Sequence, residues 1–302
     1  MAKQSIVQAV KQGRVLVSDG AWGTFLQKKG MQPGECPELW CVTHRADVLD
    51  IARGYIAAGA DMIESDSFGG TRCKLEHFGL ADRTVELNKA AASISREAAG
   101  PDKWVIASVG PTGLMTAMGD VTERNLYDFF KEQVVALAAG GAAGGADAIC
   151  VETMSALDEA EAAIRATREN TKCEAICTFT FERTVQGEYR TMMGVSPADA
   201  ARTCVAAGAH VIGANCGNGM ERMIEIVKEI RAAAPAAPIL VHSNAGLPKN
   251  VNGVDVFPET PADMAGRVAA LVAAGANIIG GCCGTTPAHI AAIKRAVDAL
   301  KR

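Results

Sequence analysis

The sequence has 302 residues, of which 49% are hydrophobic and 21% are charged, and its formal net charge is −4. This composition is typical of a globular protein with a large core, and the absence of a basic block argues against nucleic acid as its main partner. The segment 1–14 lacks the apolar stretch of a signal peptide and no run is long enough to span a membrane, so we expect a cytoplasmic protein without membrane association.

Eight short apolar runs follow one another along the chain, with helix-like segments between them. In chain order they are RVLVSDG (from Arg14), AGADMIESDS (Ala58), WVIASVGP (Trp104), GGADAICVET (Gly144), EAICTFTF (Glu174), AGAHVIGANC (Ala207), PILVHSN (Pro238) and AGANIIGGCC (Ala274). Strands alternating with helices predict a parallel sheet, and eight such units predict a (β/α)₈ TIM barrel. A doubly wound open sheet is the alternative. No linker is evident, so we expect one domain over residues 1–302.

Four of these runs share a Gly-Ala pair that predicts a helix end followed by a buried strand. The seventh residue after that glycine is Asp66, Glu152, Asn215 or Cys282, and the eighth is Ser67, Thr153, Cys216 or Cys283. Apolar residues therefore give way to polar or sulfur-containing residues at the same point of each unit. In a (β/α)₈ barrel the site lies at the C-terminal ends of the strands, and alternate strands share an inward-facing layer. We expect these side chains to meet at one mouth.

Three of the ten cysteines are candidates for a metal site. Cys282 and Cys283 are adjacent, which strains a disulfide between them, and the glycines around them permit a tight turn. Together with Cys216 they offer three thiolates, and three protein ligands with one open position are typical of a catalytic zinc site. The alternative is that all three are small buried residues. The other seven cysteines are interpreted as buried thiols.

Other strand ends carry further candidate residues. The first ends in Asp19-Gly20-Ala21-Trp22, the second offers Glu64 and Asp66, and His242 ends the seventh. Each has a plainer interpretation. Asp19 could be a turn or cap residue, Glu152 a partner in a salt bridge at the rim, and His242 a structural histidine.

Seven segments, spread over nearly the whole chain, form a recognisable pattern. They are SDGAWGT (18–24), IESDSFGGT (63–71), SVGPTG (108–113), VETM (151–154), GANCG (213–217), NAGLP (244–248) and GGCCGTTP (280–287). In these segments the chain resembles the homocysteine S-methyltransferases, and most of all the homocysteine-binding module of cobalamin-dependent methionine synthases. The resemblance implies a (β/α)₈ barrel, one zinc ion held by Cys216, Cys282 and Cys283, and formation of methionine from homocysteine. It also implies that Asp19, Gly20, Ala21, Trp22 and Glu152 bind the amino-acid end of homocysteine, with Asn215 supporting the site.

The methyl donor and the exact acceptor stay open at this point. Asp66-Ser67 stands where the family pattern has an amide and a hydroxyl residue, and Trp22 stands where the cobalamin-linked relatives usually carry a smaller or more flexible residue. Because the sequence ends after one barrel, we expect no cobalamin domain in this chain and predict methylcobalamin on a separate corrinoid protein as the donor. A small donor such as betaine or S-methylmethionine, or another thiol as acceptor, is the alternative.

Two other classes of function compete. A non-catalytic zinc- or thiol-binding module would have a fourth protein ligand in place of an open position. A (β/α)₈ lyase or aldolase would have cysteines that are merely buried, and it usually needs a lysine at a strand end. We find none there, because Lys74 and Lys249 both follow loops.

Overall fold

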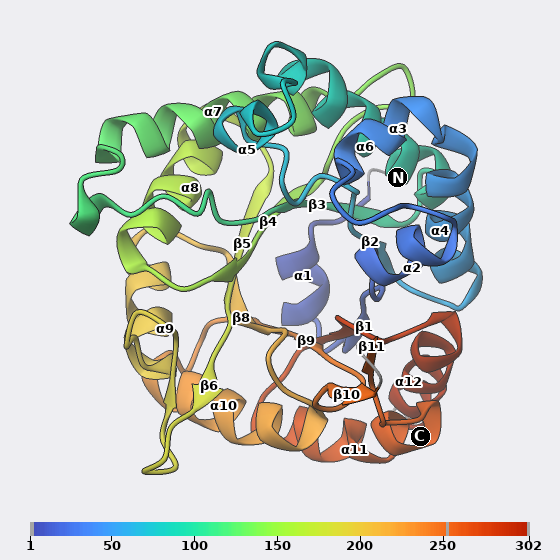
Figure 1. Ribbon diagram of the computed structural model, residues 1–302. Coiled ribbons are helices and arrows are strands. Elements are labelled where there is room, and N and C mark those ends of the chain that lie inside the picture. Colours follow the sequence, from blue (N-terminus) through green and yellow to red (C-terminus); the bar gives the residue numbers. More distant parts are fainter. Residues whose placement is uncertain (1–2, 252–253, 301–302) are drawn as a thin grey trace.

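A computed structural model describes residues 3–251 and 254–300, and it shows a ring of eight parallel strands inside a ring of helices (Figure 1). From the second strand of the ring to the eighth, consecutive strands pair with one another, and the eighth pairs with the first. The ring is completed by contacts of Asp61, whose N–H donates to Val17 O (2.7 Å) and whose Oδ2 accepts from Val17 N (3.0 Å). The predicted barrel and all eight predicted strands are confirmed, and the open-sheet alternative is excluded. The strands are β1 (Leu16–Val17), β2 (Met62–Ile63), β3 (Trp104–Val109), β4 (Ala148–Met154), β5 (Glu174–Phe179), β8 (Val211–Asn215), β9 (Ile239–Ser243) and β12 (Ile278–Gly281).

The helices return the chain from the end of one strand to the start of the next. Two of them begin with strong sequence signals: Ser196 caps α9 (Pro197–Ala206) and Thr260 caps α11 (Pro261–Ala274), each followed by a proline in the first helical turn. Two small hairpins, β6–β7 (Glu182–Arg183 and Tyr189–Arg190) and β10–β11 (Lys249–Val251 and Val254–Val256), project after β5 and β9. The helices of the ring are α2 (Gly23–Lys28), α3 (Pro37–Thr43), α4 (Arg45–Ala57), α5 (Arg72–Glu76), α6 (Thr84–Ala99), α7 (Glu123–Ala139), α8 (Leu157–Asn170), α9 (Pro197–Ala206), α10 (Met220–Ala233), α11 (Pro261–Ala274) and α12 (Pro287–Ala299).

Three of the four Gly-Ala pairs end helices as the sequence predicted. Gly59, Gly208 and Gly275 all have positive φ just after α4, α9 and α11. The fourth unit differs, because the alanine- and glycine-rich run 138–146 inserts a tight turn. There α7 ends at Gly140, which has φ 55°.

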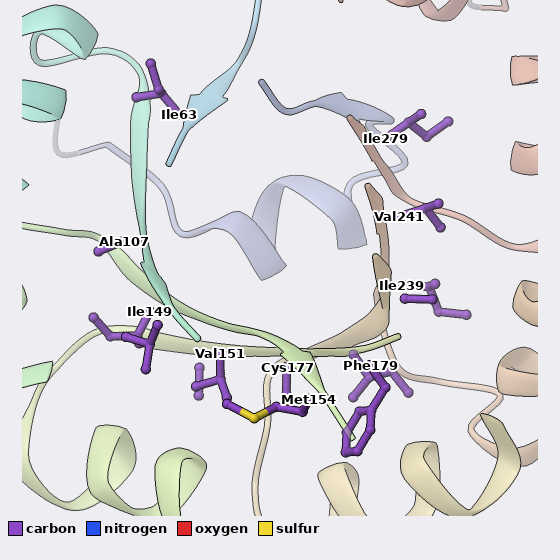
Figure 2. Packing of buried hydrophobic residues seen from close by; sticks show 14 of the residues in the cluster. Ile63, Ala107, Ile149, Val151, Met154, Cys177, Phe179, Ile239, Val241 and Ile279 are labelled. Carbon is purple, nitrogen blue, oxygen red and sulfur yellow. The ribbon is translucent and has the colours of Figure 1, made fainter. Parts of the chain in front are cut away.

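Side chains of the strands pack in two hydrophobic cores. Ile149 and Val151 of β4 point out of the barrel toward the helices and belong to the larger core (Figure 2). Ala148 and Cys150 point the other way, into a smaller core inside the barrel. Because side chains alternate along a strand, the next residue to point inward is Glu152.

The inner layer changes from apolar to polar toward the C-terminal end of the barrel. In β8 and β12 a glycine, Gly213 or Gly280, follows the last inward-pointing apolar residue. The next inward position, two residues further on, is Asn215 or Cys282. In the other six strands a buried polar residue stands two positions beyond the last inner apolar one: Ser18, Glu64, Ser108, Glu152, Thr178 and His242. A polar floor therefore lies at the end of the barrel where a (β/α)₈ enzyme carries its site.

The opposite end of the barrel is closed by α1 (Ile6–Lys11), which lies inside the ring in Figure 1. Ile6 and Ala9 pack on the inner core, and the first N–H groups of the helix, at Ile6 and Val7, donate to the Glu174 carboxylate (2.7 and 3.1 Å). The sequence analysis did not foresee this helix. Among the residues that the structure describes, no helix combines the length and the apolar character needed to cross a bilayer.

Candidate active site

The sulfur atoms of Cys216, Cys282 and Cys283 lie together at the C-terminal end of the barrel, as the aligned repeat predicted. Cys283 Sγ is 3.8 Å from Cys216 Sγ and 4.0 Å from Cys282 Sγ. Four sulfur atoms at about 2.3 Å around a tetrahedral zinc ion would be separated by about 3.8 Å. The three thiols thus have the spacing of three corners of such a tetrahedron.

Backbone geometry aims the three thiols at one point. Cys216 has φ 57°, a left-handed conformation that is uncommon for a non-glycine residue. Its N–H donates to His242 O (2.9 Å), and the Cys282 N–H donates to Ser243 O (2.7 Å), so that β9 supports both cysteine-bearing loops. Beyond the pair, Gly284 has φ 79°, and a Cβ there would lie 2.2 Å from Phe257. Only glycine therefore fits the turn that brings Cys283 back toward Cys216.

The three thiols are hydrogen-bonded to one another, and these bonds shift the pKa of each. Hydrogen bonds from Cys282 and Cys283 lower the pKa of the Cys216 thiol. The hydrogen bonds with Cys216 raise the pKa of Cys282 and of Cys283. Cys216 is therefore the thiol of the cluster that loses its proton most readily, and a bound cation would favour the thiolate form of all three. Among the described residues the cluster contains no fourth cysteine, histidine or carboxylate.

A second group of buried titratable side chains faces the same pocket. The ligand atoms of Glu64, Glu152 and His242 lie within 4.8 Å of one another, and His242 Nδ1 is 3.4 Å from Glu64 Oε1. Burial raises the pKa of Glu64 to about 8, burial and the nearby Glu64 raise the pKa of Glu152, and burial lowers the pKa of His242. Glu64 Oε1 and His242 Nε2 have no hydrogen-bond partner in the described chain. This group is suited to a ligand that brings positive charge.

Glu152 is held from both sides. Ser108 Oγ donates to its Oε1, and Asn215 Nδ2 lies 3.3 Å from its Oε2. The Asn215 amide also bonds Thr153 through N–H···Oδ1 (2.8 Å) and Nδ2–H···Oγ1 (2.7 Å), and Thr178 Oγ1 donates to Asn215 Oδ1 (2.7 Å). Asn215 is fully buried behind the pocket wall, where it fixes Glu152 and the left-handed Thr153 (φ 62°).

The loop after β1 forms the opposite wall. Gly20, Ala21 and Trp22 line the pocket, while Asp19 lies behind them with no exposed surface. Asp19 Oδ2 accepts from Trp22 Nε1 (2.9 Å) and from the Glu64 N–H (2.9 Å). Burial and the neighbouring Glu64 carboxylate raise the pKa of Asp19 to about 7.

The pocket has a volume of about 640 Å³. Asp66 and Glu38, both buried, lie in its wall. Its outer part contains residues that the sequence analysis did not place at the site, namely Phe68, Phe78, Lys74 and His77. They come from the long connection between β2 and α6. Side chains there do not alternate as in a strand, so the sequence did not indicate which ones face the pocket. Lys74, which sequence reasoning set aside as a loop residue, reaches the pocket from α5.

The remaining cysteines follow the plainer interpretation. They are free thiols, six of them buried and Cys73 half-buried. Cys36 and Cys41 donate to the buried carboxylates of Glu38 and Asp66 (3.2 and 3.7 Å). The positions of these two thiols show them as hydrogen-bond donors to the pocket wall.

The candidate site is thus a three-thiol cluster beside buried carboxylates at the C-terminal mouth of a (β/α)₈ barrel. The sequence pattern of the homocysteine S-methyltransferases matches residues 16–297. The chain belongs to the homocysteine S-methyltransferase family.

Named relatives agree with this assignment. The chain is 34% identical over 305 residues to methionine synthase of Mycobacterium tuberculosis and 33% identical over 300 residues to that of Mycobacterium leprae. These matches cover 96% and 94% of the chain but 25% and 24% of the relatives, so the chain spans about a quarter of their length. Its fold is similar to that of the metallated homocysteine methyltransferase MmuM from Escherichia coli, with a TM-score of 0.77 at 23% identity, over 95% of this chain and 98% of that one.

Proposed function

We propose that this chain transfers a methyl group to the thiol of homocysteine, giving methionine, with one zinc ion held by Cys216, Cys282 and Cys283. The observation that carries the proposal is the sulfur spacing of 3.8–4.0 Å at the floor of a pocket that also contains buried carboxylates. Bound there, zinc supplies a Lewis acid that lowers the pKa of a substrate thiol, so that the substrate sulfur is a thiolate. A fourth coordination position is left for that sulfur, because the described cluster has three protein ligands.

The amino-acid end of the substrate is proposed to bind across the pocket floor. Glu152 accepts hydrogen bonds from the substrate ammonium, which compensates the buried negative charge. Peptide groups of Gly20 and Trp22 face the substrate carboxylate, whereas the Ala21 N–H is already bonded to Thr285 Oγ1 (3.1 Å). Asp19 and Asn215 act one layer behind, through Trp22 and Glu152.

We propose methylcobalamin on a separate corrinoid protein as the methyl donor. The support is the similarity to methionine synthases that are about four times as long as the matched region. The site has to keep a reactive thiolate reduced, which favours the cytoplasm as its compartment.

One observation favours a small cationic donor, betaine or S-methylmethionine, as a second candidate. The pocket combines the aromatic rings of Trp22, Phe68 and Phe78 with the buried acids Asp66 and Glu38, which lie in the same lining as Lys74. Aromatic faces and carboxylates both attract a sulfonium or quaternary ammonium group.

X-ray absorption at the zinc edge, with and without homocysteine, tests the proposal. We expect three sulfur neighbours for the protein alone and four with homocysteine. A site with four protein ligands that homocysteine does not change would overturn the proposal in favour of the binding module. Single-turnover assays with methylcobalamin, betaine and S-methylmethionine then separate the donors.

A further inference from the structure

The two loops that build the candidate site are joined by one buried hydroxyl group. Thr285 Oγ1 donates to Cys282 O (2.7 Å) and accepts from the Ala21 N–H (3.1 Å). Cys282 belongs to the thiol cluster, and Ala21 belongs to the wall proposed to hold the amino-acid end of the substrate. The Thr285 side chain, which has no exposed surface, therefore bridges the metal half and the amino-acid half of the site.

Two glycines leave room for the Thr285 hydroxyl group. A Cβ on Gly20 would lie 2.6 Å from Thr285 Oγ1, and a Cβ on Gly281 would lie 2.3 Å from it. Both glycines have negative φ, so the backbone conformation alone does not require them. The close approach of Thr285 does require them, because real Cβ atoms do not come so near to another heavy atom.

Tyr55 of α4 completes the clamp from the other side. Its hydroxyl donates to Ala21 O at 2.6 Å, so both polar groups of the Ala21 residue are bonded to fixed side chains. Tyr55 is fully buried, and burial raises the pKa of its hydroxyl, which stays a donor. Its position inside the barrel-to-helix core leaves it little freedom to move.

We propose that Thr285, backed by Tyr55, is a positioning residue that couples zinc binding to homocysteine binding. The inference rests on the proposed function. A hydroxyl that donates to one loop and accepts from the other holds the two at a constant separation. When it is lost, the Ala21 N–H is left buried and unpaired and the Cys282 carbonyl loses one of its two donors, which favours a shift of both loops.

The test compares Thr285→Val, which keeps the shape and removes the hydroxyl group, with Thr285→Ser, which keeps the hydroxyl group. Thr167→Val is the matched control, because Thr167 is equally buried and donates to Ala163 O (3.0 Å) far from the pocket. Zinc affinity is measured by competition with a chromophoric chelator, and homocysteine affinity by calorimetry on zinc-loaded protein. Neither readout requires methyl transfer.

We expect Thr285→Val to weaken both zinc and homocysteine binding by about tenfold, the loss typical of one or two hydrogen bonds. Thr285→Ser should stay within about threefold of the parent, and Thr167→Val should lower thermal stability without changing either affinity. Unchanged affinities in a folded Thr285→Val protein would overturn the inference. So would an equal loss in Thr285→Ser and Thr285→Val.

Tyr55→Phe serves if Thr285→Val does not fold. It removes the bond to Ala21 O (2.6 Å) and the longer contact with Thr285 O (3.5 Å) but leaves the Thr285 hydroxyl in place, and we expect a weaker loss, falling mainly on homocysteine affinity. No loss of homocysteine affinity in this variant would also overturn the inference. If the parent protein binds neither zinc nor homocysteine, the proposed function itself has failed. If the parent binds both and the variants bind them with the same affinities as the parent, only the role of Thr285 has failed.

Discussion

The Trp22 indole N–H donates to Asp19 Oδ2 at 2.9 Å, and the same oxygen accepts from the Glu64 N–H. One buried carboxylate oxygen therefore fixes both the aromatic wall of the pocket and the end of β2. Sequence reasoning placed Asp19 against the substrate. The structure places it behind Trp22, from where it can shape the pocket without touching what the pocket holds.

Substitution of Asp19 tests this arrangement. In Asp19→Ala both acceptor oxygens are removed, so the bonds from Ser18, Trp22 and Glu64 are all lost. We expect the KM for homocysteine to rise about tenfold while zinc content stays at one per chain. Trp22→Phe, which keeps a ring and loses the N–H, should show a smaller change in the same direction. An unchanged KM together with lost zinc would contradict the prediction.

Glu152 is expected to carry much of the affinity for the substrate ammonium. Glu152→Gln keeps the shape and removes the charge, and the loss of a charge-assisted hydrogen bond should raise the KM for homocysteine about 10- to 100-fold. Glu159→Gln is the control, because Glu159 is a buried glutamate bonded to Thr112 at the start of α8. If the two variants have equal KM values, Glu152 has no special role toward the substrate.

Removal of one cluster thiol should abolish tight metal binding. Cys282→Ala leaves two sulfur ligands, and we expect zinc per chain, measured by elemental analysis after dialysis against a weak chelator, to fall from one to near zero. Methyl transfer should disappear with it, while circular dichroism stays unchanged. Cys73→Ala, which removes a half-buried thiol outside the cluster, should retain both. Full zinc content in Cys282→Ala would mean that the cluster does not bind the metal.

The buried carboxyl groups predict how the stability of metal-free protein depends on pH. The pKa of Glu64 rises from 4.5 to about 8 on folding and that of Asp19 from 3.8 to about 7. In this window the folded protein binds more protons than the unfolded chain. The contribution of these groups is therefore fully present below pH 4 and is lost as the pH rises toward 8.

Glu64→Gln removes one of the groups that bind a proton more tightly in the folded protein than in the unfolded chain. We expect the free energy of unfolding, measured by urea denaturation from pH 5 to 8, to fall less steeply in this variant than in the parent. The difference in slope should be at most about 1.4 kcal/mol per pH unit, the value for one proton. His242, whose pKa burial lowers, acts in the opposite direction below its ordinary pKa of 6.5 and is common to both proteins. Parallel curves would show that Glu64 does not retain a proton in the folded state.

The barrel could be predicted because its signals are local. The run 148–151 is apolar and follows a glycine-rich turn, and the Gly-Ala pair before it recurs three more times. Aligning those pairs placed Asp66, Glu152 and Cys282 at the mouth, and all three line the pocket. The outer wall could not be predicted in this way, because Phe68 and Lys74 lie on an irregular connection without a period.

The sequence also did not show which strand-end side chains line the pocket and which lie behind its wall. Asp19 and Asn215 stand at strand ends just as Trp22 and Glu152 do, yet they are bonded into a layer behind them. The positions of these side chains depend on which neighbours offer hydrogen bonds, and those neighbours come from other strands.

The sequence by itself determined the eight strands, the end of the barrel that turns polar and the three thiols that face it, because alternation and repeat spacing are properties of the local chain. Only the tertiary structure decided that Cys216 and Cys283, 67 residues apart, hold their sulfur atoms 3.8 Å apart. That distance results from closure of the barrel, from the support that β9 gives both loops and from a left-handed backbone at Cys216. These are constraints between distant segments, and no window of the sequence contains them.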